Sequence, residues 1–207
     1  KIRREYFKKE LEIEIHNLRE EIGFGKPTDL DWLEGEHLFG YCCDMIFAQI
    51  YASLNRKFIV RTIKNFSKDF KKTIKEVETI HNYIDFSDLI IRKGAIRSYK
   101  NEEMIIPLNM RDGVLSCSGK SNKEWNYSAP HGAGRVMSRT EAKSKLSVEE
   151  FKEQMKGTYS TSVCGKTIDE APGVYKDSDM IKKAIEPTAD IIDVIKPIHN
   201  IKATSEE

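Results

Sequence analysis

The spacing of apolar residues changes near residue 82, and this change limits the possible folds more than any other feature of the sequence. Before it, apolar residues recur at helical intervals in residues 2–22, 33–64 and 66–80. After it, residues 88–119 hold short runs typical of strands, separated by turn-forming residues. Helical spacing then resumes. The pattern predicts an α+β fold in which N-terminal helices are followed by a β-rich centre and C-terminal helices.

The predicted helices and strands are expected to differ in their burial. The helix over residues 33–64 is expected to be buried, because its apolar residues occupy most of the helical circumference. In the centre, tight turns at Lys93-Gly94, Lys100-Asn101 and Arg111–Gly113 are expected to join short strands. The predicted strands are DLIIR, AIRSY, EMIIPL, GVLSCSG and, near the C-terminus, DIIDVIKPI; the later helices are 139–146, 148–156 and 178–186, with a long loop over 157–178.

Charge, cysteine usage and hydropathy narrow the class of protein. The formal net charge of +1 means that any contact with nucleic acid has to come from a local patch. None of the cysteines lies in a C-x-x-C pair, which predicts free thiols in a reducing compartment. No apolar run approaches the roughly 18–20 residues of a membrane span, and no signal peptide is visible. We therefore expect a cytoplasmic protein without a membrane partner; its cysteines are Cys42, Cys43, Cys117 and Cys164.

Residues 128–142, SAPHGAGRVMSRTEA, combine several features of a phosphate-binding site. Gly132 and Gly134 let the backbone approach a ligand closely, and consecutive N–H groups there can form an anion-binding concavity. Ser138 followed three residues later by Glu141 predicts a capping box, and so the start of a helix. The N–H groups at that helix end would add partial positive charge beside the same loop.

His131 stands at the edge of this loop, and Arg135 and Arg139 add guanidinium groups suited to phosphate. A neutral imidazole there can be a metal ligand, a general base or a nucleophile on phosphorus, and the residues alone do not choose among the three. The alternative is a tight turn that contains His and Arg without a function. Three other histidines have no such surroundings and are interpreted as ordinary solvated or interfacial residues: His16, His37 and His199.

The segment His131–Ala142, HGAGR-x-MSR-x-x-A, resembles the guanylylation motif of the RtcB family of RNA ligases. Further segments resemble the family in order and spacing: 44–56 (DMIFAQIYASLNR), His81-Asn82, Arg92–Ala95 (RKGA), 105–110 (IIPLNM), 170–177 (EAPGVYKD) and IHNIK, ending at Lys202. The resemblance spans nearly the whole chain and is weak over residues 1–30. It implies that residues 1–207 form the C-terminal part of a single catalytic domain, helical over about 1–82 and nucleotide-binding over about 83–202.

The resemblance also implies a reaction. In this family, two manganese ions bind beside a histidine that attacks the α-phosphate of GTP. The GMP is then passed to an RNA 3′-phosphate, and the 5′-hydroxyl of a second RNA end displaces it. Ends with a 2′,3′-cyclic phosphate are first hydrolysed to the 3′-phosphate. The expected partners are therefore GTP and RNA, either tRNA exon halves or cleaved RNA ends awaiting repair.

The residue roles follow from the same resemblance. His131 would be the nucleophile that carries GMP, and His81 a manganese ligand. Arg135 and Arg139 would hold phosphates of the nucleotide or the RNA. The guanylate contacts would be Asn82, Pro107, Leu108, Asn109, Met110, Gly132, Ala133, Gly134, Tyr175 and Lys202. Five basic residues near the β-rich centre would either guide an RNA backbone or form a solvated face: Arg92, Lys93, Arg97, Arg111 and Lys120.

Departures from the family pattern bear on activity. The family's other metal ligands, in D-x-x-C, GNHF-like and HSGSR-like segments, are not found in this sequence. A lone His81 does not suffice for two metal ions, so this chain by itself is expected to be inactive. Leu108, Val114 and Ser121 also differ from residues common in the family. The sequence is thus interpreted as a piece of a longer ligase or, alternatively, as a truncated noncatalytic module that binds nucleotide or a partner.

Two further functions rank below these. A metal-dependent phosphoesterase using His131 and His81 lacks the carboxylate-rich ligands such sites usually have. Gly119-Lys120-Ser121 resembles the end of a P-loop, but Val114 stands where the first glycine belongs, so a P-loop is rejected. Finally, a chain that lacks half of its domain should expose an apolar patch where the other half would lie.

Overall fold

The computed structural model describes Ile13, Asn17 and residues 32–66 and 75–202. The predicted helix over residues 2–22 lies outside these residues except at Ile13 and Asn17, which are both helical, and His16 also lies outside them. The chain divides into two compact units, Lys1–Tyr51 and Ala52–Glu207. Every strand of the described chain, and the loop that carries His131, belongs to the second unit.

Helix α2 spans Gly35–Phe66 and confirms the predicted helix, but the expectation that it is buried is wrong. None of its residues is buried in the described structure. Large side chains such as Phe47 (74% exposed) and Phe58 (69%) face solvent. Apolar character makes burial favourable but does not supply a partner to pack against. The expected exposed apolar patch is therefore present, and it lies along this helix.

The predicted helix over residues 66–80 is wrong over residues 75–80, while residue 66 is the last residue of α2. Residues 75–80 have no regular secondary structure, and residues 67–74 lie outside the described part. Three charged side chains of this segment are held by ion pairs with other parts of the chain: Lys75 with Glu103, Glu76 with Lys64, and Glu78 with Arg56. The Thr79 hydroxyl donates to the carbonyl of Ile105, in a strand. Such tertiary contacts override a weak helical preference.

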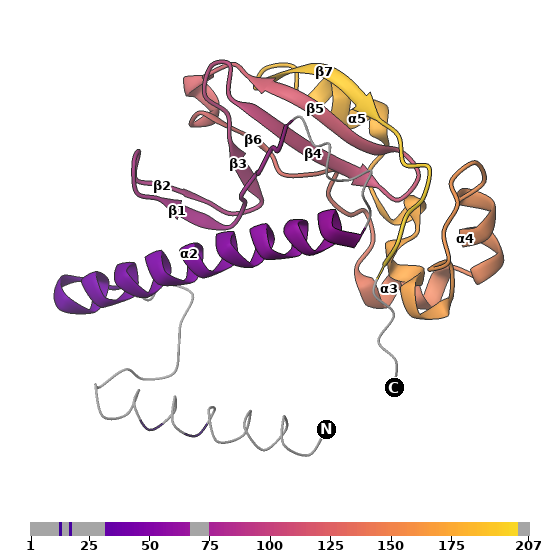
Figure 1. Ribbon diagram of the computed structural model, residues 1–207, viewed down its shortest axis with the longest axis horizontal. Helices are drawn as coiled ribbons and strands as arrows, with labels where there is room; N and C mark the ends of the chain where they lie inside the picture. Colours follow the sequence, from indigo (N-terminus) through magenta and orange to yellow (C-terminus); the bar gives the residue numbers. More distant parts are fainter. Residues whose placement is uncertain (1–12, 14–16, 18–31, 67–74, 203–207) are drawn as a thin grey trace. The chain divides into compact units, whose positions relative to one another are not determined.

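The strands form three antiparallel sheets (Figure 1). Strand β1 pairs with β2, β3 pairs with β6, and β4, β5 and β7 form a three-stranded sheet in that order. The strands are β1 Tyr83–Asp85, β2 Ile90–Arg92, β3 Ala95–Arg97, β4 Glu103–Asn109, β5 Gly113–Gly119, β6 Ser128–Pro130 and β7 Ala189–Ile195. The predicted strands are confirmed. The sequence did not predict β1 and β6, because these two strands have three residues each and depend on a partner elsewhere in the sequence.

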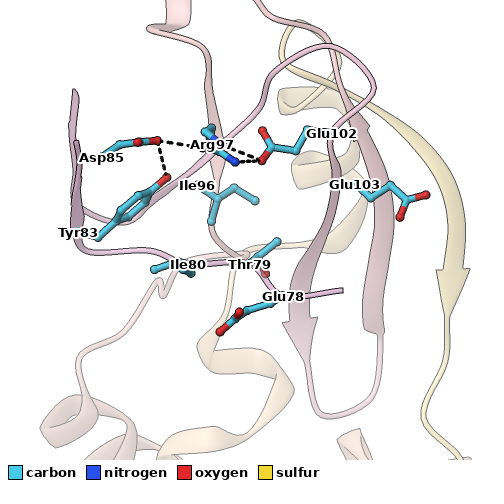
Figure 2. Close-up of a pocket in the computed structure, with 9 residues that line it drawn as sticks. All are labelled: Glu78, Thr79, Ile80, Tyr83, Asp85, Ile96, Arg97, Glu102 and Glu103. Carbon is cyan, nitrogen blue, oxygen red and sulfur yellow. Dashed lines mark hydrogen bonds and ion pairs between the residues drawn. The ribbon is translucent and has the colours of Figure 1, made fainter. Parts of the chain in front are cut away.

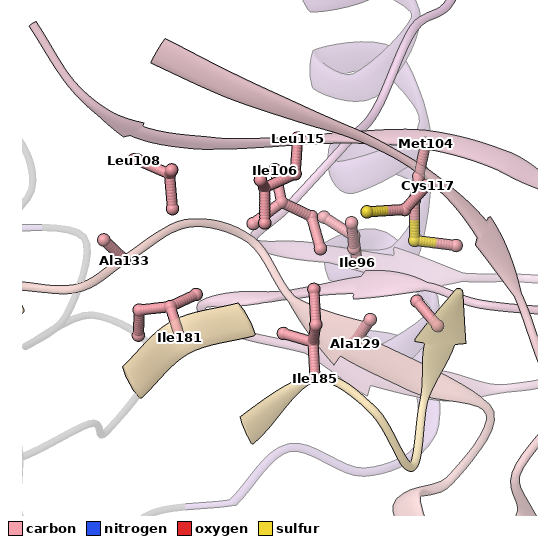
Figure 3. Close-up of a cluster of buried hydrophobic side chains, with 11 residues drawn as sticks. Ile96, Met104, Ile106, Leu108, Leu115, Cys117, Ala129, Ala133, Ile181 and Ile185 are labelled. Atoms are coloured by element: carbon pink, nitrogen blue, oxygen red, sulfur yellow. The ribbon is translucent and has the colours of Figure 1, made fainter. Parts of the chain in front are cut away.

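The main hydrophobic core lies on one face of the three-stranded sheet (Figure 3). Alternate residues of β4 and β5 are buried, as the period of a strand requires. Their side chains pack against Ile181 and Ile185 from helix α5, Ser178–Ala184, and its C-terminal cap. Burial raises the pKa of the Cys117 thiol to about 11, so it stays neutral within this core. All four cysteines of the chain are free thiols.

A second core joins the short helices that follow the glycine loop. It contains Phe151, Met155 and Val174, and Tyr175 packs against both cores. The elements are α3 Arg139–Lys145, α4 Val148–Gln154 and the 3₁₀ segments η2 Lys123–Trp125, η3 Gly165–Glu170 and η4 Pro172–Val174. At α3, Ser138 caps the backbone N–H of Glu141 as predicted, but the Glu141 side chain pairs with Lys145 instead of completing the box. No helix in the described part of the chain is long and apolar enough to cross a membrane.

Candidate functional site

A pocket of about 720 Å³ lies where the glycine loop, the end of β4, Tyr175 and the C-terminal segment meet. Every residue that the sequence assigned to the site lines this pocket, except His81 and Asn82. These residues are Pro107, Leu108, Asn109, Met110, His131, Gly132, Ala133, Gly134, Arg135, Arg139, Tyr175 and Lys202. Segments that are distant in sequence therefore share one cavity of the size usual for small ligands.

The pairing of β3 with β6 determines where His131 stands. Ala95 pairs with Pro130, which brings Gly94 next to His131 at the end of the two strands. The Nδ1 atom of His131 lies 2.6 Å from the carbonyl oxygen of Gly94. A carbonyl oxygen only accepts, so Nδ1 carries the proton, and in the neutral imidazole Nε2 is the nitrogen with the free lone pair. This tautomer leaves Nε2 available as a nucleophile, a base or a ligand.

His81 and Asn82 lie beside the imidazole instead of lining the pocket. The ring of His81 is 4.7 Å from that of His131, measured between centroids. The side-chain oxygen of Asn82 accepts a hydrogen bond of 2.6 Å from the backbone N–H of Gly94. Asn82 thus holds the residue whose carbonyl, in turn, holds His131. In this structure its side chain supports the imidazole.

The glycine loop lies close against the end of β4. The N–H of Ala133 donates to the carbonyl of Pro107 over 3.0 Å. A Cβ atom on Gly132 would lie 3.1 Å from the same carbonyl oxygen, which is tighter than ordinary contact. Gly134 has φ +70, a conformation that glycine adopts readily. Glycine is therefore needed here for close approach and for backbone conformation, as expected from the motif.

One carboxylate that the sequence patterns did not single out connects three of the predicted site residues. Glu170 accepts hydrogen bonds from Arg135 (2.7 Å), the Tyr175 hydroxyl (2.8 Å) and Lys202 (3.2 Å). Burial favours the neutral carboxyl, but the bond from Tyr175 and the charges of Lys202 and Arg135 outweigh it, so the pKa of Glu170 is lowered. Burial and Glu170 together raise the pKa of Tyr175 to about 12. The signal for Glu170 was its place at the start of the EAPGVYKD segment, five residues before Tyr175.

The two arginines of the motif differ in how free their guanidinium groups are to bind an anion. Arg135 is engaged by Glu170, by the carbonyl of Asp169 and by the ring of Tyr175, whose centroid lies 5.0 Å away. The side chain of Arg139 is 74% exposed and has one long contact of 3.6 Å with Asp169. Arg139 therefore offers its guanidinium to an incoming anion, whereas Arg135 mainly organises the wall of the pocket.

The basic residues expected near the β-rich centre do not form a free patch. Arg92 is buried, with 2% of its surface exposed, and pairs with Asp85 and Asp88, so its predicted role as an RNA guide is wrong. Burial made it a structural residue, because a buried guanidinium needs carboxylate partners. The other pairs are Arg97 with Asp85 and Glu102, Arg111 with Asp112, and Lys120 with Asp190. Lys93 is exposed and has no ion pair within the described part of the chain.

A smaller pocket of about 140 Å³ is rich in carboxylates (Figure 2). Arg97 lies between Asp85 and Glu102 and pairs with both, as the dashed lines in Figure 2 show. Glu78 and Glu103 pair with Arg56 and Lys75. Each carboxylate of this pocket therefore has a cationic partner.

No group of three or more His, Cys, Asp or Glu side chains suited to a metal ion occurs within residues 32–66 and 75–202, or at Ile13 and Asn17. His81 has the imidazole of His131 beside it but, among these residues, no third ligand. Two manganese ions need several ligands each. The described residues of this chain therefore do not fit that pair of ions on their own.

Comparisons with known proteins agree with the motifs. Residues 29–203 match the model of a family described as tRNA-splicing ligase RtcB. RNA-splicing ligase RtcB1 of Escherichia coli is 33% identical over 189 residues, which cover 82% of this chain and 45% of the relative. RNA-splicing ligase RtcB of Escherichia coli K12 is 32% identical with the same coverage. The tRNA-splicing ligase RtcB of Aeropyrum pernix is 33% identical over 111 residues, 45% of this chain and 23% of that protein.

The chain thus spans a little under half the length of the bacterial relatives that it matches over most of its own residues. The matched region contains every strand of the described chain and the whole of the pocket around His131. By its family match and its relatives, this chain belongs to the RtcB family.

Proposed function

We propose that the protein containing this chain joins RNA 3′-phosphate or 2′,3′-cyclic phosphate ends to 5′-hydroxyl ends, using GTP and a GMP–histidine intermediate at His131. The observation that carries this proposal is the hydrogen bond from His131 Nδ1 to the Gly94 carbonyl at the rim of the 720 Å³ pocket. It makes Nε2 the nitrogen with the free lone pair in the neutral imidazole, beside a glycine loop and two arginines. The names of the relatives, RNA-splicing and tRNA-splicing ligases, support RNA as the substrate.

The first step forms a bond between Nε2 of His131 and the α-phosphorus of GTP, and breaks the bond to the β-phosphate oxygen, releasing pyrophosphate. In this step Arg139 is exposed and placed to neutralise phosphate charge. The guanylate lies against the glycine loop, Tyr175 and Lys202. We expect Glu170 to keep Tyr175 and Lys202 oriented, because it binds both in the present structure.

The next two steps transfer the nucleotide. An oxygen of the RNA 3′-phosphate attacks the phosphorus of the adduct, the P–N bond breaks, and His131 regains its lone pair. The 5′-hydroxyl of the second end then attacks the activated 3′-phosphate, loses its proton and releases GMP. A cyclic phosphate end is first opened by water to the 3′-phosphate. The RNA ends come from tRNA splicing or from cleaved RNA.

We further propose that the chain adopts the arrangement of the C-terminal part of the family's catalytic domain, and that its own residues do not complete the reaction. Among the described residues, His81 is the one candidate manganese ligand. The manganese ions implied by the family therefore require further ligands from outside these residues. The second candidate function, a noncatalytic nucleotide-binding module, is favoured by the same lack of a three-ligand group in the described residues.

The test is transfer of label from GTP labelled at the α-phosphate, with manganese present. The chain is assayed alone and together with a polypeptide that supplies the part of the RtcB domain that this chain does not cover. We expect an acid-labile, alkali-stable adduct in the combined sample, located on His131 by mass spectrometry. If the folded, metal-loaded combination binds GTP but forms no adduct, the ligase proposal fails and the nucleotide-binding module replaces it.

The close approach at Gly132 gives a second prediction. Gly132→Ala places a methyl group 3.1 Å from the Pro107 carbonyl, so the loop has to move away from β4. We expect GTP binding to weaken by roughly fivefold to tenfold, about 1 kcal/mol, as is common for overpacking. Titration calorimetry measures this change. Gly165→Ala is the matched control, because nothing lies within 4 Å of its added Cβ; equal affinities for the two variants would contradict the prediction.

A further inference from the structure

A second cavity adjoins the nucleophile from another side. It has a volume of about 400 Å³ and is lined by β2, the Lys93-Gly94 turn, β6, Trp125 and the end of α5. Gly94 lines this cavity, while its carbonyl accepts the hydrogen bond from His131, which lines the nucleotide pocket. A hydrogen bond therefore joins a residue that lines one cavity to a residue that lines the other.

Trp125 gives this cavity an aromatic wall that is held in place. It ends η2, whose first turn is capped by the Asn122 side chain through the N–H of Glu124. Asn126 and Tyr127 follow in the left-handed conformation, and the Tyr127 ring stacks on Tyr99 at 5.2 Å. These contacts fix the turn, yet they leave Trp125 56% exposed. Tryptophan combines a large apolar ring with a polar N–H group and is enriched at binding surfaces.

The charge beside Trp125 indicates what the cavity binds. Of the basic residues near the β-rich centre, Arg92, Arg97, Arg111 and Lys120 have carboxylate partners. Lys93 lines the cavity, is exposed, and has no ion pair among the residues that the structure describes. An aromatic face next to an uncompensated cation suits a nucleobase followed by its phosphate.

We propose that this cavity is a subsite for a single-stranded RNA end, in which a base stacks on Trp125 and the adjoining phosphate contacts Lys93. The inference rests on the proposed function for its biological meaning, since it places an RNA end next to His131. Its volume is in the range of small-ligand pockets and is sufficient for one nucleotide. Stacking tolerates any base, which suits an enzyme that joins ends of varied sequence.

The test uses the fluorescence of Trp125 in the 207-residue chain. The sequence has two tryptophans, so Trp32→Phe leaves Trp125 as the single emitter. This protein is titrated, without GTP, with a short single-stranded oligoadenylate that carries a 3′-phosphate. We expect saturable quenching, and weaker or no quenching by a duplex of the same length, because paired bases are not free to stack.

Two variants, followed by the anisotropy of a dye-labelled oligonucleotide, separate stacking from charge. Trp125→Leu keeps an apolar side chain and is expected to raise the Kd for the oligonucleotide about tenfold. Lys93→Gln is expected to raise it about threefold and to reduce the dependence of log Kd on log salt by roughly 0.7. Lys123→Gln, in the same turn but outside the cavity lining, is the matched control and should leave the salt dependence unchanged.

The outcomes distinguish this inference from the ligase proposal. Unchanged RNA affinity in Trp125→Leu would overturn the subsite even if the His131 adduct forms. Quenching without any adduct would support the subsite and count against ligation. If Trp125 emission changes with protein concentration, or on adding the family's missing length, and RNA then causes no quenching, the surface is a protein contact and the inference is wrong.

Discussion

Replacing His131 by alanine is expected to abolish the transfer of GMP from GTP, with a loss of roughly 10⁴-fold or more. The reason is chemical: Nε2 forms the bond to phosphorus, and in this structure the Gly94 carbonyl, 2.6 Å away, holds the proton on Nδ1. Alanine offers no atom for that bond. The measurement compares the amount of labelled adduct formed by the variant and by the parent. Each is combined with a polypeptide that supplies the part of the RtcB domain that this chain does not cover.

The control for this prediction removes another imidazole. His37 lies on α2 and does not line the pocket, so the adduct of His37→Ala should match that of the parent. GTP affinity should fall far less in His131→Ala than adduct formation does, because the remaining lining residues are unchanged. A His131→Ala protein that is still labelled would mean that another residue is the nucleophile.

Replacing Arg92 by methionine is expected to lower the free energy of unfolding by about 3–5 kcal/mol. The guanidinium is buried and donates to Asp85 (3.1 Å), Asp88 (2.7 Å) and the hydroxyl of Ser128 (3.0 Å). Methionine fills similar volume but leaves Asp88 without its ion-pair partner, and Asp85 with the longer contact of 3.4 Å to Arg97. Because Arg92 connects β2 to β6, the turn at Gly94 and the position of His131 should also loosen. Chemical denaturation measures the loss.

The pH dependence of this loss provides an internal check. Burial favours the neutral form of both carboxyls. Hydrogen bonds from Ser87 outweigh this effect at Asp85, and hydrogen bonds from Arg92, Ile90 and Tyr99 outweigh it at Asp88, so both pKa values lie below 3.8 in the folded parent. A lowered folded pKa gives stability that is present above about 3.8 and is lost as the pH falls through the folded value. Without Arg92 the share of this contribution that comes from Asp88 should shrink, so the difference in stability between parent and variant should narrow in acid.

Arg111→Met is the matched control for Arg92→Met. Arg111 pairs with its neighbour Asp112 and its side chain is 44% exposed, so the expected loss is within about 0.5 kcal/mol. If Arg92→Met costs as little as Arg111→Met, the buried network contributes no more than a surface ion pair, and Arg92 does not stabilise the fold through its buried carboxylate partners.

Local patterns in the sequence were sufficient to predict much of the site. The glycine loop around His131, the cap at Ser138 and the alternating residues of β4 and β5 depend on neighbours within a few positions. Such preferences depend only on residues close together in the sequence. Resemblance to a family then grouped segments that no local rule connects, and apart from His81 and Asn82 their residues line one pocket.

Contacts between distant segments decided the rest. The sequence by itself determined the α+β class and the glycine loop, and its resemblance to a family named His131 as the candidate nucleophile. Only the tertiary structure brought Glu170 to Arg135, Tyr175 and Lys202, made Arg92 a buried structural residue, and kept residues 75–80 out of a helix. It also left α2 exposed, although its composition favoured burial. The physical reason is that burial and charge pairing depend on which side chains meet in space, and spacing along the chain does not specify those partners.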